Sequence, residues 1–210
     1  MENNLDIIAV QETKINNEEQ ADAMVVALTS RYYVCISHAV SSSGGCALFF
    51  KKSMGIVIEN VMSCETGRFI AHDFNFSGLS FRAICLHAPN KPTERKVLFE
   101  RIDLVDDIDV LVLGDYNCVC HAEDRAGTGT AHDANAELLS TIVTEHGLEG
   151  IASVMSGGQH AQCTHYQNNS HARLDRAYIS ANLVHACTTY EVKHVSFSDH
   201  SLVMFTLGKA

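Results

Sequence analysis

The chain is built mainly of short apolar runs separated by polar turns. Two of them, LDIIAV at residues 5–10 and DVLVL at residues 109–113, are β-branched and too short for a buried helix, so both predict buried strands. Further runs of this kind predict strands at residues 31–36, 45–51, 55–60, 68–76, 79–87, 173–179 and 201–207.

Three stretches have helical spacing instead, at residues 17–30, 93–104 and 133–146. The first begins at Asn17, a good N-cap, and has two glutamates in its first turn, where the helix dipole favours negative charge. Pro92 precedes the second stretch and Gly147 follows the third, which is the usual placement of these residues at helix starts and ends.

This succession of elements limits the fold class. Many short strands with a few helices between them indicate an α+β or layered α/β fold, in which two sheets pack face to face with helices outside. A chain of 210 residues suits one large domain, residues 1–210. A content of 46% hydrophobic and 19% charged residues is ordinary for a globular protein and argues against a disordered one.

The sequence contains neither a recognisable targeting signal nor a CxxC pair of cysteines. No apolar stretch approaches the roughly 18 residues of a membrane span, and the start MENNLDIIAV does not resemble a signal peptide. The 8 cysteines form no CxxC pair, so a zinc site of paired cysteines is not indicated. We interpret most of them as reduced core residues of an intracellular protein with no membrane partner.

The charge balance is acidic, with 15 basic and 25 acidic residues and a net charge of −10. It argues against a protein that coats nucleic acid, because such binding comes mainly from neutralising phosphates. It does not exclude an enzyme that meets nucleic acid through a bound metal ion.

Four polar clusters lie at ends of the predicted strands, where loops on a rigid sheet tend to carry function. They are Gln11-Glu12-Thr13, Gly114-Asp115-Tyr116-Asn117, Arg173-Leu174-Asp175 and Ser198-Asp199-His200. Each cluster alone is more simply explained as a solvated turn or a helix cap. Together they supply oxygen ligands for a hard cation, an amide, and a histidine with an aspartate to orient it. Metal-assisted hydrolysis of a phosphoester needs that set of groups.

At these residues the sequence resembles a known family. The segments IIAVQETK, LHAPN, VLVLGDYNCV, ARLDRAYIS and SFSDHSLV occur in an order and spacing similar to the endonuclease/exonuclease/phosphatase superfamily. The chain most resembles the endonuclease domain of non-LTR, LINE-type retrotransposons, and the resemblance runs from about residue 5 to residue 207. It implies an α/β fold, the four-layered sandwich of the deoxyribonuclease type.

The resemblance also implies roles for individual residues in binding a cation and activating water. Glu12 would be the main ligand of Mg²⁺, with Mn²⁺ as an alternative cofactor, and Asp199 would assist at the metal or at the leaving group. Asp115 would orient or deprotonate the attacking water. Asn117 would hold that water or the scissile phosphate.

Other roles concern the phosphate. Asp175 would hydrogen-bond His200, and His200 would contact the phosphate and stabilise its developing charge. Asn90 and Thr164 would bind substrate. Family members usually carry a tyrosine where this chain has His87, which would then act either as a phosphate donor in place of the phenol or as a residue without a role.

A second departure concerns the start of the chain. Family members have an Asn-containing strand and a helix before the segment that matches LDIIAV, whereas only MENN precedes it here. We therefore expect a truncated copy that lacks its first strand and helix, with lower stability and slower nicking than a restored version.

The expected activity is Mg²⁺-dependent nicking of double-stranded DNA, which leaves a 3′-hydroxyl that primes reverse transcription. The reverse transcriptase of the parent polyprotein would be a partner, and the protein would act in the nucleus. Two alternatives remain open, a phosphatase of the same superfamily acting on a small phosphoester and an inert remnant of such a domain.

Overall fold

The computed structural model describes residues 5–40, 43–64, 66–102, 104, 107–128, 133–156 and 162–208. The chain divides into two compact units, Met1–His87 and Ala88–Ala210, here called the N-terminal and C-terminal units. Each is described by itself. The expectation of a single domain stays a prediction.

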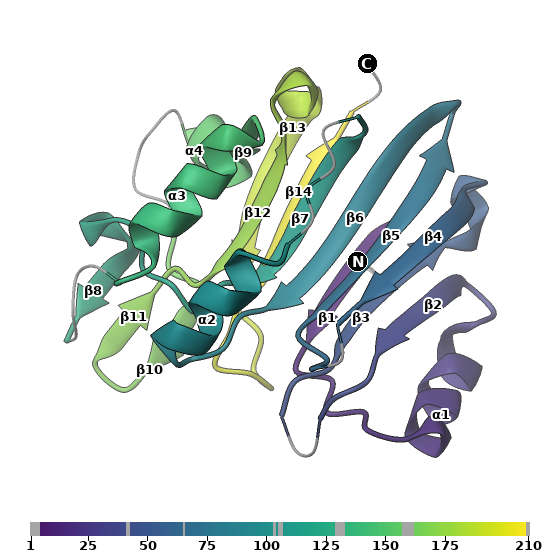
Figure 1. Ribbon diagram of the computed structural model, residues 1–210, viewed down its shortest axis with the longest axis horizontal. Coiled ribbons are helices and arrows are strands. Elements are labelled where there is room, and N and C mark those ends of the chain that lie inside the picture. The colour runs from purple at the N-terminus through teal and green to yellow at the C-terminus, as the bar shows by residue number, and fades with distance from the viewer. Residues whose placement is uncertain are drawn as a thin grey trace. The chain divides into compact units, whose positions relative to one another are not determined.

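The N-terminal unit contains a three-stranded antiparallel sheet covered by a helix (Figure 1). The strand order is β1-β3-β2, with bounds β1 (Ile7–Gln11), β3 (Cys46–Lys51) and β2 (Tyr32–Ser37). Helix α1 (Glu18–Leu28) begins where the Asn17 side chain accepts a hydrogen bond from the Gln20 amide. Its apolar residues pack on a buried cluster in the sheet made by Tyr32, Ala47 and Phe49. Side chains alternate between the two faces of β3. Ala47 and Phe49 therefore face α1, and Phe50 points to the opposite face.

A second set of strands in this unit forms an antiparallel meander. Its bounds are β4 (Val57–Ser63), β5 (Phe69–Phe76) and β6 (Leu79–His87), after a 3₁₀ turn η1 (Lys52–Met54). The meander packs against β3, where the ring of Phe50 lies 5.3 Å from that of Phe74 and 6.1 Å from that of His72. These aromatic rings fill the space between the two sets of strands.

The C-terminal unit is built around β7 (Asp109–Asp115), which pairs antiparallel with β12 (Asp175–Ser180); β12 also pairs with β9 (Leu148–Gly150). Its helices are α2 (Pro92–Phe99), α3 (Ala136–Glu145) and α4 (Ile151–Ser156). Short antiparallel strands follow the order β10 (His165–Gln167), β11 (Ser170–Ala172) and β8 (Arg125–Gly127). The last pair is β13 (Cys187–Lys193) with β14 (Leu202–Leu207), and 3₁₀ turns lie at η2 (Ala122–Asp124) and η3 (Ala181–Ala186).

The strands and the first helix predicted from the sequence are confirmed within a few residues of their expected ends. The helix expected at 93–104 is wrong at its C-terminus, because α2 ends at Phe99, whose ring packs 6.2 Å from Tyr116. Residue 103 of that expected helix lies outside the described residues. The third helix begins three residues later than expected, after a turn in which Asp133 accepts from the Asn135 amide. Strands β8 to β11, β13 and helix α4 were not predicted.

Two negative expectations can be compared with the structure. All 8 cysteines are free, and four of them, Cys46, Cys85, Cys118 and Cys120, are buried core residues, whereas the other four are partly exposed. No helix in the described part of the chain is long and apolar enough to cross a membrane.

Candidate active site

The end of β7 carries the first pair of site residues. The Asp115 carboxylate accepts two hydrogen bonds from Asn117, one from the backbone amide at 2.8 Å and one from Nδ2 at 3.0 Å. Asn117 Nδ2 also donates to the Ala88 carbonyl at 2.8 Å, and its φ of 45° lies in the left-handed region that asparagine tolerates. The Gly-Asp-x-Asn turn is therefore a closed arrangement that fixes the directions of both side chains.

The adjacent strand β12 carries Asp175, which forms the second pair of site residues with His200. The register of β7 and β12 sets Asp115 opposite Asp175. Asp175 Oδ2 lies 2.8 Å from His200 Nδ1, although the two residues are 25 positions apart. Because a carboxylate only accepts, Nδ1 is the donor, and Nε2 is the ring nitrogen left for another group.

The charge state of His200 follows from these neighbours. Burial lowers the pKa of His200, but the hydrogen bond and negative charge of Asp175, with Asp115 and Asp199, outweigh it and raise the pKa to about 9. The ring is therefore protonated at neutral pH, which makes it a cationic donor suited to a phosphate anion.

Thr164 holds the two halves of this pair together. It is fully buried, and its hydroxyl accepts from the backbone amides of Leu174 at 3.0 Å and Asp175 at 2.9 Å. Its carbonyl accepts from the Ser201 amide at 2.6 Å, beside His200. The hydroxyl thus positions the backbone at Leu174 and Asp175, and the contact of Thr164 with phosphate stays a prediction.

Asp124, in the turn η2, is a residue that supports the site. It is buried, and its carboxylate forms ion pairs with Arg173 at 2.7 Å and Arg176 at 2.8 Å, the residues on either side of the Leu174-Asp175 dipeptide. Burial raises the pKa of Asp124, but the charges and hydrogen bonds of the two arginines outweigh it and hold the pKa below its usual value. Both guanidinium groups are therefore engaged inside the unit.

Asn90 lies exposed on the loop before α2, and Arg95 fixes that loop. The buried Arg95 guanidinium donates to the carbonyls of Pro89 and Asn90 and forms an ion pair with Asp133 at 2.5 Å. The backbone of the Asn90 loop is therefore fixed, while its side chain is accessible. Substrate binding by Asn90 stays a prediction.

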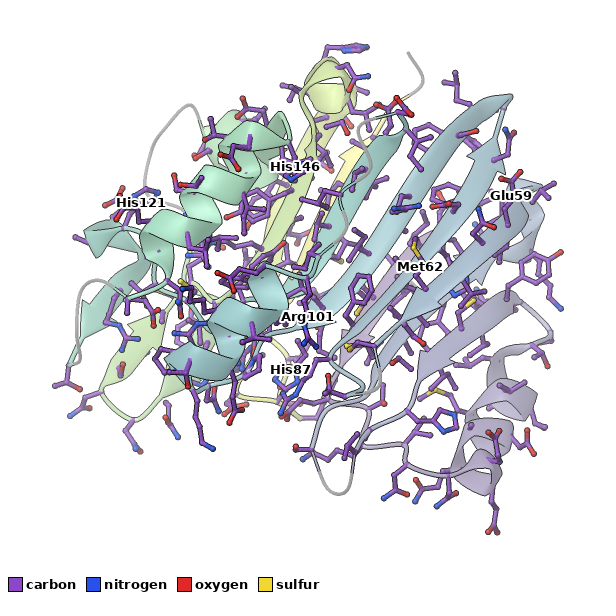
Figure 2. All side chains as sticks on the ribbon, viewed as in Figure 1. Glu59, Met62, His87, Arg101, His121 and His146 are labelled. Atoms are coloured by element: carbon purple, nitrogen blue, oxygen red, sulfur yellow. The ribbon has the colours of Figure 1, made fainter. Side chains whose placement is uncertain are left out.

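In the N-terminal unit, Glu12 and His87 lie close together. His87 ends β6 (Figure 2) and is nearly buried, with its Nε2 3.6 Å from Glu12 Oε1. Arg68 approaches His87 Nδ1 at 2.9 Å, and because a guanidinium only donates, Nδ1 must accept. A ring that accepts at Nδ1 is neutral, with its proton on Nε2, on the side of Glu12. His87 is thus placed to orient Glu12, and its expected contact with phosphate stays untested.

The backbone at Glu12 is held in an unusual conformation by the glycines before β3. Glu12 has a φ of 53°, and the next amide, of Thr13, donates to the Gly45 carbonyl at 3.1 Å. Gly45 has a φ of 84°, and a Cβ added there would overlap the Thr13 hydroxyl. A non-glycine residue in the left-handed region costs free energy and is concentrated at functional sites. The loop therefore has a fixed, strained shape that presents the Glu12 carboxylate, which is 52% exposed.

Asp199 precedes His200 and has a 61% exposed side chain, with Oδ2 3.5 Å from His165 Nε2. The C-terminal unit therefore brings Asp115, Asn117, Asp175, Asp199 and His200 into one neighbourhood. A cation position shared by Glu12 and Asp199 stays a prediction.

Comparison with known proteins agrees with this geometry. Residues 2–200 match the model of the endonuclease/exonuclease/phosphatase family. The chain belongs to this family. It is a family of metal-dependent nucleases and phosphatases, so the resemblance seen in the sequence motifs is confirmed.

One curated relative is a transposon protein. The chain is 23% identical over 185 residues to the transposon TX1 uncharacterized 149 kDa protein of Xenopus laevis, which covers 84% of this chain and 14% of the relative. The chain thus spans about one seventh of the length of the relative it matches.

Solved structures share the fold. The AP endonuclease LMAP from Leishmania major has a TM-score of 0.79 at 15% identity and covers 98% of this chain and 79% of its own. A 3′ phosphatase from Neisseria, solved with a product DNA hairpin, has a TM-score of 0.79 at 16% identity and covers 99% and 91%. The fold class predicted from the sequence, α/β of the deoxyribonuclease type, is therefore confirmed.

Proposed function

We propose that this family member is a Mg²⁺-dependent endonuclease that nicks double-stranded DNA. The observation that carries the proposal is the Asp175–His200 hydrogen bond of 2.8 Å, set by strand register opposite Asp115 and its partner Asn117. Such a group of acid, amide and oriented imidazole is what phosphodiester hydrolysis requires around the phosphorus atom.

The donor chemistry fits a hard divalent cation. Glu12 and Asp199 offer carboxylates that are 52% and 61% exposed, and Mg²⁺ prefers carboxylate oxygens together with several waters. We propose these two residues as its ligands, with Mn²⁺ as an alternative ion. When bound, the ion neutralises charge on the phosphate oxygens and lowers the pKa of a coordinated water.

The other catalytic roles belong to residues of the protein. Asp115 orients the attacking water or accepts its proton, and Asn117, fixed by the Ala88 carbonyl, holds that water or a phosphate oxygen. His200 donates from Nε2 to the phosphate as negative charge develops, while Asp175 keeps the ring in the required orientation. The buried Thr164 and Asp124 hold the backbone on which Asp175 lies.

The transposon relative supports a biological context. We propose that the nick leaves a 3′-hydroxyl that primes reverse transcription at a new genomic site in the nucleus. The partner in this reaction would be a reverse transcriptase domain of the same polyprotein.

A phosphatase acting on DNA ends is the second candidate. It is favoured by the structural neighbour from Neisseria, which is described as a 3′ phosphatase with a product DNA hairpin. The chemistry at phosphorus is shared, so substrate choice alone separates the two candidates.

The test is nicking of supercoiled plasmid with Mg²⁺ by the wild type and by the variant Asp175→Asn. Removing the charge next to His200 should slow nicking by about 10²- to 10⁴-fold, the usual contribution of a positioned proton-transfer group. Asp22→Asn, an exposed acid in α1, is the matched control and should keep wild-type activity.

Two outcomes would contradict the proposal. A wild-type protein that leaves plasmid intact but releases phosphate from 3′-phosphorylated oligonucleotides would favour the phosphatase. A folded protein with neither activity would favour the inert remnant.

A further inference from the structure

Three potential metal ligands converge in the C-terminal unit, where two chain segments lie side by side. His165 pairs with His200 in an isolated antiparallel bridge, and the Tyr166 amide donates to the Asp199 carbonyl at 2.9 Å. The rings of His165 and His200 are 4.7 Å apart between centroids, at 54°. One ligand atom from each of His165, Asp199 and His200 lies within 4.8 Å of the others.

We propose that His165, Asp199 and His200 form a site for a divalent transition metal of the Zn²⁺ class. Two imidazoles and one carboxylate suit Zn²⁺ and Co²⁺, whereas Mg²⁺ prefers oxygen ligands alone. His165 therefore makes this site chemically different from the Mg²⁺ position proposed above, although Asp199 belongs to both.

Two of the three ligand atoms are already at a suitable spacing. His165 Nε2 and Asp199 Oδ2 are 3.5 Å apart. Ligands at the Zn²⁺ bond lengths are about 3.3 Å apart in a tetrahedral site, so these two atoms need to move very little. The fourth position is left to water, since the side chain of Asp199 is exposed to solvent.

The surroundings of His200 resemble those of a zinc-bound histidine. Nδ1 of His200 donates a hydrogen bond to Asp175 at 2.8 Å, so Nε2 is the nitrogen that would bind the metal. Metal-bound histidines usually donate their other nitrogen to a carboxylate in this way, which fixes the ring and strengthens its bond to the metal. The backbone bonds of Thr164 and Tyr166 to Ser201 and Asp199 keep the two segments in register.

Occupation of this site has a functional consequence, which rests on the proposed function. A metal bound to His200 Nε2 takes the nitrogen that would donate to the phosphate, and it also engages Asp199. We therefore expect Zn²⁺ to inhibit Mg²⁺-dependent nicking.

The binding test uses Co²⁺ alone and needs no enzymatic activity. The wild type is titrated at pH 8, because a metal must displace the Nε2 proton of His200. It should bind one equivalent of Co²⁺ with the intense visible absorption of a four-coordinate ion. The variants His165→Gln and His165→Phe should lose this absorption, whereas His185→Gln, an exposed histidine in η3, should retain it.

Thermal melts without metal show whether each variant is folded. Identical Co²⁺ titrations for the wild type and both folded His165 variants would overturn the site, as would the weak absorption of a six-coordinate ion in the wild type. If one His165 variant does not fold, the other decides.

Inhibition by Zn²⁺ is tested separately. The nicking rate is measured at fixed Mg²⁺ with increasing Zn²⁺, and each variant's rates are normalised to its own rate without Zn²⁺. Half-inhibition should need at least about tenfold more Zn²⁺ in the His165 variants. Four-coordinate Co²⁺ binding without any nicking would leave the site standing and remove the proposed function. Equal Zn²⁺ sensitivity in all variants would overturn the inhibitory role of this site.

Discussion

At the scale of single residues, several buried polar side chains act on the backbone of the site and do not reach solvent. Thr164 is the clearest, because one side chain accepts two amide hydrogen bonds at Leu174 and Asp175. A buried amide without an acceptor costs about 1–3 kcal/mol.

This predicts different effects for two substitutions at Thr164. Thr164→Val keeps the shape but leaves both amides unpaired, so it should destabilise the protein by about 1–3 kcal/mol per amide and reduce nicking. Thr164→Ser keeps the hydroxyl and should restore most of both properties. Urea denaturation and the plasmid assay measure the two effects, and equal stability of the Val and Ser variants would show that the hydroxyl does not hold this segment.

His72 is an unusual core residue, buried between the two sets of strands in the N-terminal unit. Neither ring nitrogen has a hydrogen-bond partner among the described residues. Burial lowers the pKa of His72, although the charge of Asp73 partly opposes this. The folded protein therefore favours the neutral ring.

The consequence is a loss of stability in mild acid. The unfolded chain binds a proton on this histidine near pH 6.5, above the lowered pKa of the folded state. The contribution of neutral His72 to the free energy of unfolding is therefore fully present above pH 6.5. It is lost as the pH falls below this value, by up to about 1.4 kcal/mol per pH unit. His72→Leu should flatten the dependence of unfolding free energy on pH between pH 5 and 6.5, and His185→Leu, on the surface, should not. A pH dependence unchanged by His72→Leu would contradict this account.

At the scale of elements, one carboxylate joins the loop after β7 to the start of β12. Asp124, in the turn η2, binds Arg173 and Arg176 and accepts from the amides of Cys120 and His121. The loop after the Gly-Asp-x-Asn turn and the start of β12 are therefore joined at a single buried group.

Removing this charge should be costly. Asp124→Asn leaves the buried Arg176 and the partly buried Arg173 without their counter-ion, and breaking a buried ion pair from one side costs about 3–5 kcal/mol. We expect a fall of this size in the free energy of unfolding, measured by chemical denaturation. Glu123→Gln changes the exposed neighbour and is the matched control, expected to differ from the wild type by less than about 0.5 kcal/mol. A comparable small effect for Asp124→Asn would show that the two arginines find other partners.

At the scale of the whole chain, charge works against binding DNA. The net charge is −10, and Arg173 and Arg176, beside Asp175, are engaged by Asp124. We expect duplex DNA to bind weakly without divalent cations, near the weak end of non-specific binding at about 10⁻⁴ M.

The dependence on salt follows from the same reasoning. Each phosphate neutralised by the protein adds about 0.9 to the slope of log affinity against log salt, so few contacts predict a slope shallower than about −4. Fluorescence anisotropy of a labelled duplex in EDTA measures both quantities. Tight binding with a steep slope would reveal a basic surface that the charge balance conceals.

The sequence by itself determined the longer strands and the family, and it supplied the candidate site residues. Runs such as LDIIAV and DVLVL are too short and too β-branched for helices, and both form strands. The expectation of a buried strand holds for β7, whereas it is wrong for β1, whose five residues are only partly buried. Polar residues at the ends of such strands lie on loops at an edge of a sheet. Short strands such as β8 and β10 could not be predicted, because three residues carry no periodicity and their pairing depends on distant partners.

Only the tertiary structure decided which polar residues support the site. The registers of β7 with β12 and of residues 164–166 with 199–201 bring Asp175, Thr164 and His200 together across the chain. From the sequence, Asp124 has two open interpretations, a structural residue or part of a solvated turn, and His165 is one histidine among many in polar loops. Folding buries Asp124 between Arg173 and Arg176, and strand pairing places His165 beside His200. Neither burial nor long-range pairing is a property of local sequence.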